Sequence, residues 1–344
     1  MCIVWLFITI VETAPHPYTL RMTLRYPRLF TLLSIIAVAW FATTSAQANT
    51  PSENPDTLRV LVWNLWHGGN EINNGPEKAL QLIKDSGADI CLLQESHDIK
   101  GPRPKFGLWA AEELGWNAWM GDSTHLCVLS PYKFKQTFIR SKQHCVGAEL
   151  EDHKGRTIHA FTVWIESKHY TPYHLRDHPQ STDAELLACE TTHSRRLKQA
   201  TGILRYLEQN KLDSLQTPLL VGGDWNNPSH LDWTQGVEEV FPPRRPLPFP
   251  VSMQMEKNGF IDIYRNLYPD PFTHPGNTWT PLRSSVPQDR IDRLYYKSNQ
   301  AVPQLRPVRT TLYPEVLEDE SIPTPERQFS SDHAALLIEF EWIE

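Results

Sequence analysis

The chain has 344 residues, of which 40% are hydrophobic and 21% charged, so it can bury a core and is not intrinsically disordered. Its 28 prolines exceed its 16 glycines, which predicts stiff loops rather than a helical bundle. The net charge of −7 excludes a basic nucleic-acid surface at the level of the whole chain, so a phosphate ligand would need a local site.

The first residues of the chain have the pattern of an export signal. Arg25 and Arg28 precede an apolar run at 29–42, and small residues follow up to an Ala-Gln-Ala sequence that ends at Ala48. A basic segment, an apolar segment and an A-x-A site are typical of a secretory signal peptide. A membrane anchor is the alternative, but the run is shorter than the roughly 20 residues that a bilayer span needs.

The predicted domain boundary follows from this leader. We expect residues 1–48 to be a signal peptide, with Met22 as a possible start, and residues 49–344 to be one domain. The mature protein is then secreted or periplasmic, without a transmembrane segment after cleavage.

Export implies an oxidising compartment, in which disulfides persist. Cys91 lies in an apolar strand sequence and is expected to be a small core residue. The remaining cysteines of the mature chain allow one disulfide, and Cys127–Cys145 is the suggested pair. Their spacing matches no paired CxxC zinc pattern.

The first half of the mature chain predicts mostly strands. Residues 58–64 and 88–94 are apolar runs typical of buried strands, and Pro76 begins a helix between them that Gly87 ends. A short helix is expected at 109–114. Turn signals then separate four runs that predict an antiparallel meander, at 125–130, 136–139, 145–150 and 157–165.

The second half predicts a long helix and a few strands. Residues 193–209 place apolar side chains on one helical face, and further strands are expected at 218–221, 291–296 and 334–340. The segments 168–192 and 241–250 are interpreted as surface insertions, the latter extended and exposed. Helices that fall between pairs of strands predict an α+β class, with two sheets inside and helices outside.

Polar side chains follow five of the predicted strands or precede them. They are Asn64, Glu95, Asp224 with Asn226, Asp292, and Asp332 with His333. An acid at one strand end commonly caps a helix or begins a turn. Five such ends in one sheet stack instead predict a shared rim, where loops carry function.

The chemistry of this set indicates a metal-dependent hydrolase. Clustered carboxylates need a cation, and hard oxygen ligands without thiolates favour Mg²⁺, Mn²⁺ or Ca²⁺ over zinc. Such a cation neutralises charge on phosphoryl oxygens and activates water. An adjacent Asp and His supply an oriented general base.

These residues and their motifs resemble the endonuclease/exonuclease/phosphatase superfamily, which includes pancreatic-type deoxyribonucleases, abasic-site endonucleases, sphingomyelinases and inositol polyphosphate phosphatases. The similarity runs from Leu58 to Phe340, and the combination of GGDWNN with a late SSDHAAL is specific. The other matching motifs are WNLWHGG, LLQES and DRIDRLYY. The resemblance implies a DNase I-like four-layer α/β/β/α sandwich with its site at one rim.

The resemblance also implies a role for each matching position. Glu95 would be the principal metal ligand, assisted by Asn64, and Asp332 a further ligand or a water-orienting acid. Asp224 and Asn226 would position the attacking water and the scissile phosphate. His333, oriented by Asp292, would contact the phosphate or act as base.

The chain departs from the family pattern at one place. The family has Asn-x-His at the end of the strand that matches 155–165, whereas this chain has Thr162, Val163 and Trp164 there. An indole has no basic nitrogen, so another group must replace the imidazole. His169, Tyr170 and His174 in the following segment are candidates, with solvated loop residues as the alternative, and Trp164 is expected to be a pocket wall or core residue.

Three further residues have two interpretations each. His67 is a neighbour of the metal ligands or a structural hydrogen-bonding residue, and Trp279 flanks the substrate or packs in the core. Arg290 holds a phosphate bidentately or, as we favour, forms an ion pair with an acid.

The predicted activity is an exported, Mg²⁺- or Mn²⁺-dependent phosphoesterase that hydrolyses a phosphodiester or phosphomonoester by in-line attack of water. The expected partner is a phosphorylated small molecule, a lipid head group or a nucleic acid, and we expect a monomer. One alternative is an extracellular nuclease, which the acidic charge disfavours. The other is a catalytically silent member that binds a phosphorylated ligand or a protein, as the missing imidazole suggests.

Overall fold

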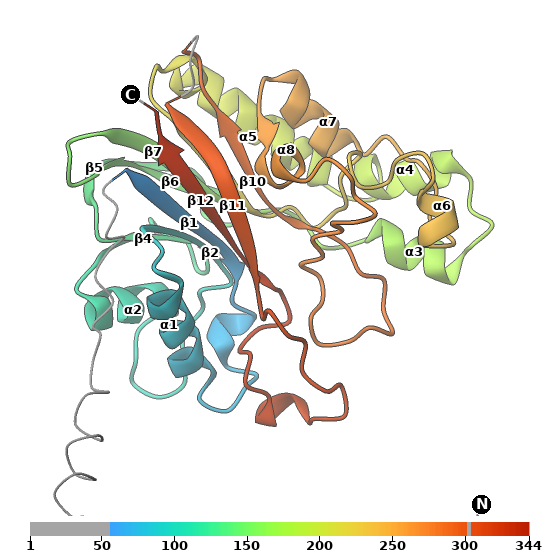
Figure 1. Ribbon diagram of the computed structural model, residues 1–344, viewed down its shortest axis with the longest axis horizontal. Coiled ribbons are helices and arrows are strands. Elements are labelled where there is room, and N and C mark those ends of the chain that lie inside the picture. Colours follow the sequence, from blue (N-terminus) through green and yellow to red (C-terminus); the bar gives the residue numbers. More distant parts are fainter. Residues whose placement is uncertain (1–55, 301–303, 344) are drawn as a thin grey trace, which may run out of the picture. The chain divides into compact units, whose positions relative to one another are not determined.

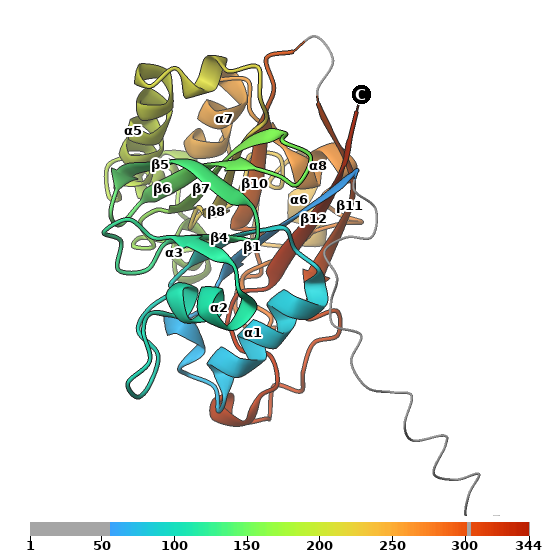
Figure 2. The same cartoon turned by 90° about the vertical axis from the view of Figure 1, so that its left-hand side faces the viewer.

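Two six-stranded sheets lie face to face with helices on their outer sides (Figures 1 and 2). The structure, a computed structural model, describes residues 56–300 and 304–343. The predicted signal peptide at 1–48 lies outside the described residues. Within the described part of the chain, no helix is long and apolar enough to cross a membrane.

Each sheet contains one parallel pair among antiparallel neighbours. The first sheet has the order β11 (Leu305–Tyr313), β12 (Ala335–Trp342), β1 (Thr57–Asn64), β2 (Ile90–Gln94), β4 (Cys127–Ser130), β3 (Asn117–Trp119). The second has the order β5 (Lys133–Ser141), β6 (Cys145–Glu151), β7 (Thr157–Trp164), β8 (Leu219–Asp224), β10 (Asp292–Lys297), β9 (Ile261–Asp262). The parallel pairs are β1 with β2 and β7 with β8.

Helices cover the outer faces of both sheets. The first sheet packs against α1 (Gly75–Ser86) and α2 (Phe106–Leu114), the second against α5 (Arg196–Gln209) and α7 (Pro250–Lys257). The remaining described helices are α3 (Thr171–Asp177), α4 (Asp183–Thr191), α6 (Val237–Val240) and α8 (Ile263–Leu267), with short 3₁₀ turns at His67–Gly69, Leu212–Ser214 and Thr324–Glu326.

Side-chain alternation along the strands creates the layers. On β1, Val60 and Val62 point between the sheets, where they join a core with residues of β8, β10 and β12. Leu61 and Trp63 point the other way, towards α1 and α2. The strand is therefore apolar on both faces, as the sequence predicted, because it is covered on both. The predicted α+β class and the four-layer α/β/β/α sandwich are confirmed.

The register of the strands brings the predicted polar positions to one rim. Asn64 pairs with Gln94, so Glu95 follows directly beside it. In the second sheet Asp224 pairs with both Trp164 and Asp292. The parallel strands β1, β2, β7 and β8 all end at this rim, and the antiparallel strand β10 begins there.

One expectation about the strands was wrong, and one long strand was not predicted. The run at 125–130 does not join the meander, because β4 pairs with β2 in the first sheet and the chain crosses to the second sheet at Tyr132, which is buried between them. Strand β11 was not expected, since its sequence contains Pro307 and charged residues. It is an edge strand with an irregularity after Pro307, a position that tolerates proline.

The two supposed insertions are more structured than expected. The segment 168–192 contains α3 and α4, and Thr182 caps α4 in a capping box with Glu185. In the segment 241–250, Leu247 and Phe249 are buried with Trp233. That segment is therefore not simply extended and exposed, because its alternate apolar side chains form a small core of their own.

The suggested Cys127–Cys145 disulfide is wrong. All four cysteines of the described residues are free and buried. Cys127 faces the helices of the first sheet and Cys145 faces those of the second, so the two side chains lie on opposite outer sides of the sandwich. Cys91 is a core residue, as predicted.

Burial of His159 predicts a measurable dependence of stability on pH. Burial lowers the pKa of His159 to about 4, and its Nδ1 lies 3.1 Å from the Thr217 hydroxyl. The unfolded chain therefore binds more protons between pH 6.5 and 4, and the stabilisation present above pH 6.5 is lost as pH falls through this range. The difference in unfolding free energy between wild type and His159→Gln should fall by about 3 kcal/mol from pH 7 to pH 4 in urea titrations. A constant difference would contradict this assignment.

Candidate functional site

A pocket of about 380 Å³ opens at the rim where the strand ends meet, and we call it the main pocket. Its wall combines acids and amides with aromatic side chains. The lining residues are Trp66, His67, Glu95, Trp164, Ser167, His169, Tyr170, Tyr173, Asp224, Asn226, Trp279, Ile291, Asp332 and His333.

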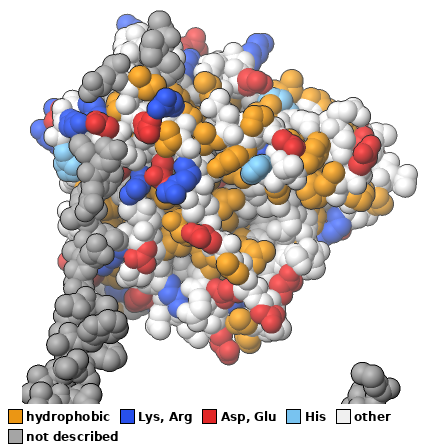
Figure 3. Space-filling model, in the orientation of Figure 1, with side chains coloured by type: hydrophobic (Ala, Val, Ile, Leu, Met, Phe, Trp, Pro, Cys, Tyr) orange, Lys and Arg blue, Asp and Glu red, His pale blue; other side chains and the backbone are white. Residues whose placement is uncertain are grey.

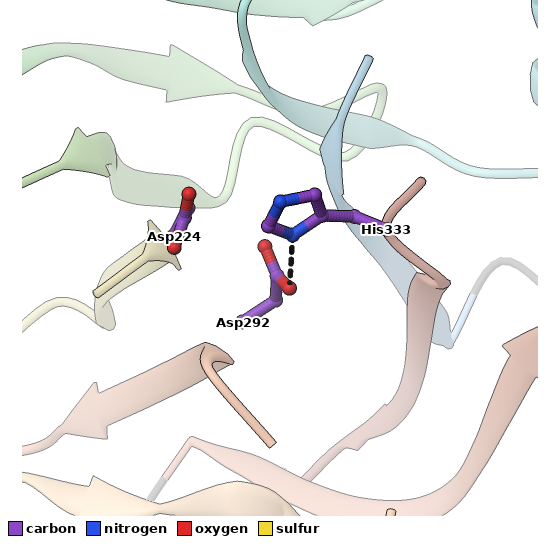
Figure 4. A group of neighbouring side chains, drawn as sticks. All are labelled: Asp224, Asp292 and His333. Carbon is purple, nitrogen blue, oxygen red and sulfur yellow. Dashed lines mark hydrogen bonds and ion pairs between the residues drawn. The ribbon is translucent and has the colours of Figure 1, made fainter. Parts of the chain in front are cut away.

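Asp224 and His333 line the main pocket, and their side chains form a close group with that of the buried Asp292, which we call the base of the site (Figure 4). One ligand atom of each lies within 4.8 Å of the others, and all three residues are buried. His333 Nδ1 is 2.9 Å from Asp292 Oδ2. The carboxylate thereby fixes the imidazole orientation, as the sequence predicted for this pair.

Asn64 connects this base to the mouth of the pocket. Its amide nitrogen donates to Glu95 Oε1 at 3.2 Å and to Asp224 Oδ2 at 3.1 Å. The amide oxygen accepts from the backbone of Trp66 at 3.0 Å and is not directed at the carboxylates. Asn64 therefore contacts two carboxylates, and its assistance as a metal ligand stays a prediction.

The charges of the site perturb one another strongly. Burial, with Asp292 and Glu95 nearby, raises the pKa of Asp224 to about 7, although His333 opposes the shift. Burial likewise raises the pKa of Asp332 to about 7. Burial disfavours a charged imidazole, but the carboxylates of Asp292, Asp224 and Asp332 together outweigh it and raise the pKa of His333 to about 10. His333 therefore holds a proton at neutral pH in the protein without bound cation.

The donor set fits a hard divalent cation. Asp292 Oδ1 and Asp332 Oδ1 are buried oxygens without a hydrogen-bond partner in the described residues. Carboxylate oxygens are the ligands that Mg²⁺ and Mn²⁺ prefer, and no thiol lines the pocket.

Backbone strain is concentrated around the main pocket. Five lining residues that are not glycine have positive φ angles, namely Trp66 (44°), His67 (56°), Glu95 (52°), His169 (54°) and Asn226 (50°). Such conformations cost on the order of 1 kcal/mol or more for a residue with a Cβ atom, and they cluster at functional sites. The strain directs Glu95 and Asn226 inwards from the strand ends.

Trp164 occupies the position where the family has its imidazole. It lines the main pocket, as predicted, and its ring stacks at 6.3 Å on His144. Of the proposed substitutes, His169 and Tyr170 line the pocket, and the Tyr170 hydroxyl donates to Asp289 Oδ2 at 3.1 Å. His174 does not line it, and its Nε2 lies 3.1 Å from the hydroxyl of Ser181, in the turn between α3 and α4.

Of the remaining predicted residues, His67 and Trp279 line the main pocket and Arg290 does not. His67 lies beside the acids, since its backbone N–H donates to Glu95 at 3.1 Å, and the Trp279 ring is 4.9 Å from that of His333. Arg290 does not reach the pocket. It is buried in ion pairs with Asp232 and Asp262, both at 2.9 Å, so the favoured interpretation as an ion pair is confirmed.

Sequence reasoning missed two aromatic lining residues, Trp66 and Tyr173. Trp66 could have been predicted from the sequence, because it follows Asn64 by two residues in the same motif. Tyr173 enters the pocket only because α3 folds back over it, and the Trp279 indole donates to its hydroxyl at 3.1 Å.

The chain belongs to the endonuclease/exonuclease/phosphatase family, whose model matches residues 61–333. It is 24% identical over 316 residues to an uncharacterised Caenorhabditis elegans protein, F14F9.5, covering 88% of this chain and 96% of that protein. The predicted membership of the superfamily is thereby confirmed, and with it a hydrolase class that generally uses a divalent metal.

Solved structures share the fold at low sequence identity. A family protein from Bacteroides thetaiotaomicron superimposes with a TM-score of 0.53 at 13% identity, covering 85% of this chain and all of that one. Humanised D. rerio TDP2 gives 0.52 at 15% identity, over 83% and 99% of the two chains. Truncated C. elegans TDP2 gives 0.51 at 18%, over 83% and 97%.

Removing the carboxylate of Asp292 should lower the pKa of His333. Asp292→Asn takes away the nearest of the carboxylate charges that raise this pKa, and loss of one close opposite charge shifts a pKa by about 1 to 3 units. A titration of the imidazole signals by NMR from pH 6 to 11 measures this shift in the protein without metal. The signals of exposed His153 serve as an internal control. An unchanged His333 titration would show that Asp292 does not set its protonation.

Proposed function

We propose that the protein is an exported, Mg²⁺- or Mn²⁺-dependent phosphoesterase that hydrolyses a phosphodiester or phosphomonoester by in-line attack of water. The observation that carries this proposal is that Glu95, Asp224, Asp332 and His333 line one pocket, with the buried Asp292 paired to His333 beneath them. The proposal of export rests on the sequence pattern at 1–48 alone. The cysteines of the described residues are free, so no disulfide adds support for an oxidising compartment.

Glu95 and Asp332, at the pocket wall, would hold the cation, with Asn64 fixing the Glu95 carboxylate. When bound, the cation supplies positive charge to the phosphoryl oxygens and favours ionisation of water.

The side chains at the base of the pocket would handle protons and position the reactants. His333 holds a proton that it can share with a phosphoryl oxygen or give to the leaving group, and Asp292 keeps its ring oriented. Asn226 donates to Asp224 Oδ2 at 2.9 Å, so this carboxylate faces the pocket in one orientation. Asp224 and Asn226 would therefore align the attacking water against phosphorus.

The walls of the main pocket favour a small substrate over a polynucleotide. No lysine or arginine is among its lining residues, and Trp66, Trp164, Tyr170, Tyr173 and Trp279 supply aromatic walls. On the face seen in Figure 3, basic side chains are interspersed with acidic ones and form no continuous basic track. A structure of D. rerio TDP2 contains a single-strand DNA product, so a nuclease remains the second candidate.

Hydrolysis of bis(p-nitrophenyl) phosphate tests the proposed activity. We expect turnover with Mg²⁺ or Mn²⁺ that EDTA abolishes. Asp224→Ala and His333→Ala should each lower the rate at least about 100-fold, because each removes a group that acts in the transition state. The exposed residues Asp122 and His153 supply matched alanine controls, which should keep the wild-type rate. Full activity in the site variants would refute the roles, and binding of metal without turnover would indicate a silent member.

A salt titration of DNA binding separates the two candidate substrates. DNA that binds at a pocket without lysine or arginine releases few counterions, because few of its phosphates are neutralised. The plot of log affinity against log salt concentration should therefore have a slope of magnitude below about 2. Fluorescence anisotropy with a labelled single strand between 50 and 300 mM NaCl measures it. Tight binding with a steep slope would support the nuclease instead.

A further inference from the structure

The 3₁₀ turn after β1 places an accessible imidazole beside the carboxylate of Glu95. His67 lines the main pocket together with Glu95, and its side chain is 55% exposed, so solutes reach the ring. Its Nε2 lies 3.8 Å from Glu95 Oε2. A hydrogen bond from nitrogen to oxygen measures about 2.7 to 3.2 Å, so these two atoms are too far apart to form one.

The same separation fits two ligands of one cation. Nitrogen and oxygen ligands lie about 2.1 Å from a small divalent cation, which puts two of them about 3 Å apart at a right angle and about 4.2 Å apart on opposite sides. The 3.8 Å between His67 Nε2 and Glu95 Oε2 falls within this range. Glu95 Oε2 already accepts from the backbone N–H of His67 at 3.1 Å, and an ionised carboxylate oxygen has a second lone pair for a cation.

Glu71 sets the direction of the lone pair on the His67 ring. His67 Nδ1 lies 2.9 Å from Glu71 Oε1. An ionised carboxylate accepts hydrogen bonds only, so Nδ1 donates, and Nε2 of the neutral ring keeps its lone pair on the side of Glu95. A carboxylate that accepts from the far nitrogen of the ring is the common support of a histidine that binds a metal.

The backbone holds His67 beside Glu95. Residues 66–69 have successive positive φ angles of 44°, 56°, 71° and 81°, a conformation that neighbouring structure must sustain at the positions that are not glycine. The side-chain nitrogen of Asn70 donates to the backbone oxygen of His67 at 2.6 Å and to that of Asp98 at 2.8 Å. Asn70 therefore ties the turn after β1 to the loop after β2, which carries Glu95.

An imidazole ligand changes which cation a carboxylate site prefers. Mg²⁺ takes oxygen ligands and keeps several of its waters. Nitrogen ligands favour first-row transition-metal ions, and the affinity of a mixed nitrogen and oxygen site rises from Mn²⁺ to Co²⁺. A site that combines His67 with Glu95 should therefore discriminate between these ions and Mg²⁺.

We propose that His67 Nε2 is a ligand of the cation that Glu95 holds, and that this ligand makes the site prefer a first-row transition-metal ion over Mg²⁺. Glu71 is the positioning residue that orients the ring. The proposal rests on the proposed phosphoesterase function, in which Glu95 holds a divalent cation, and it narrows the choice of that cation.

Isothermal titration calorimetry with MgCl₂, MnCl₂ and CoCl₂ tests the preference in the absence of substrate. We expect the wild type to bind Co²⁺ most tightly, Mn²⁺ next and Mg²⁺ most weakly. His67→Ala should lower the affinity for Co²⁺ and Mn²⁺ by about 10-fold or more and change that for Mg²⁺ little, so the preference narrows. Glu71→Gln should narrow it less, because the ring remains. His153→Ala removes an exposed histidine and should match the wild type.

The competing explanation is that His67 only forms ion pairs with the two acids beside it. A ring in that role carries positive charge and repels a cation, so its removal would strengthen the binding of all three ions alike. That outcome would overturn the proposal. Equal affinity of the wild type for the three ions would overturn it as well.

Electron spin-echo spectroscopy of bound Mn²⁺ identifies the ligand directly, because a coordinated nitrogen modulates the echo. We expect a nitrogen modulation in the wild type and in His153→Ala, and its loss in His67→Ala. No modulation in the wild type would show that the cation has oxygen ligands only. A modulation that persists in His67→Ala would place the cation on another imidazole of the pocket, such as His333. Either result would overturn the assignment.

These readouts separate the inference from the proposed function, because neither uses turnover. A preference for Co²⁺ and Mn²⁺ that is lost together with the nitrogen signal in His67→Ala would support the ligand even if the aryl phosphodiester is not hydrolysed. Hydrolysis by a wild type that binds Mg²⁺ as tightly as Mn²⁺ and Co²⁺ would support the proposed function and overturn this inference.

Discussion

Negative charge buried at one end of the sandwich is the constraint on which the rest of the site depends. Glu95, Asp224, Asp292 and Asp332 lie around a single imidazole, and water reaches few of their oxygens. Carboxylates this close repel one another, and burial adds to the cost of their charges. The amide of Asn64 and the ring of His333, whose pKa is raised, offset part of this cost, and among the described residues Asp292 Oδ1 and Asp332 Oδ1 have no hydrogen-bond partner. A divalent cation would complete that balance, which gives the family's metal dependence a physical reason in this chain.

The two sheets bring the site together because each contributes strand ends at the same edge. Asn64 and Glu95 come from the first sheet, and Asp224 and Asp292 from the second. The apolar core between the sheets holds these edges in register, so the positions of the carboxylates depend on packing far from the pocket. The positive φ angles at Glu95 and Asn226 show that this packing also sustains local strain at the edge.

Aromatic and neutral walls distinguish this site from one built to follow a nucleic-acid backbone. Trp66, Tyr173 and Trp279 surround the acids, whereas the arginines nearest in sequence, such as Arg290, are held in ion pairs away from the pocket. The phosphate of the proposed substrate would then meet the acids at the pocket and the rest of the molecule its aromatic walls. The relatives share the fold at 13–18% identity, a level at which the walls of a pocket can differ while its base is retained.

Much of this protein could be predicted from the sequence, because local patterns encode it. Apolar runs marked the central strands, and acids and amides at their ends marked Asn64, Glu95, Asp224, Asp292 and His333 before any contact was known. The edge strand β11, the sheet to which β4 belongs and the buried side chains of 241–250 were missed, because strand partners and burial depend on distant residues. The contacts of the Asn64 amide with Glu95 and Asp224 could not be predicted, since these residues lie 31 and 160 positions away in the chain. The contact of Trp164 with His125 joins residues 39 positions apart and was missed for the same reason. Residue types and their order along the chain therefore determined the chemistry, whereas sheet packing decided which groups meet and which are left without a partner.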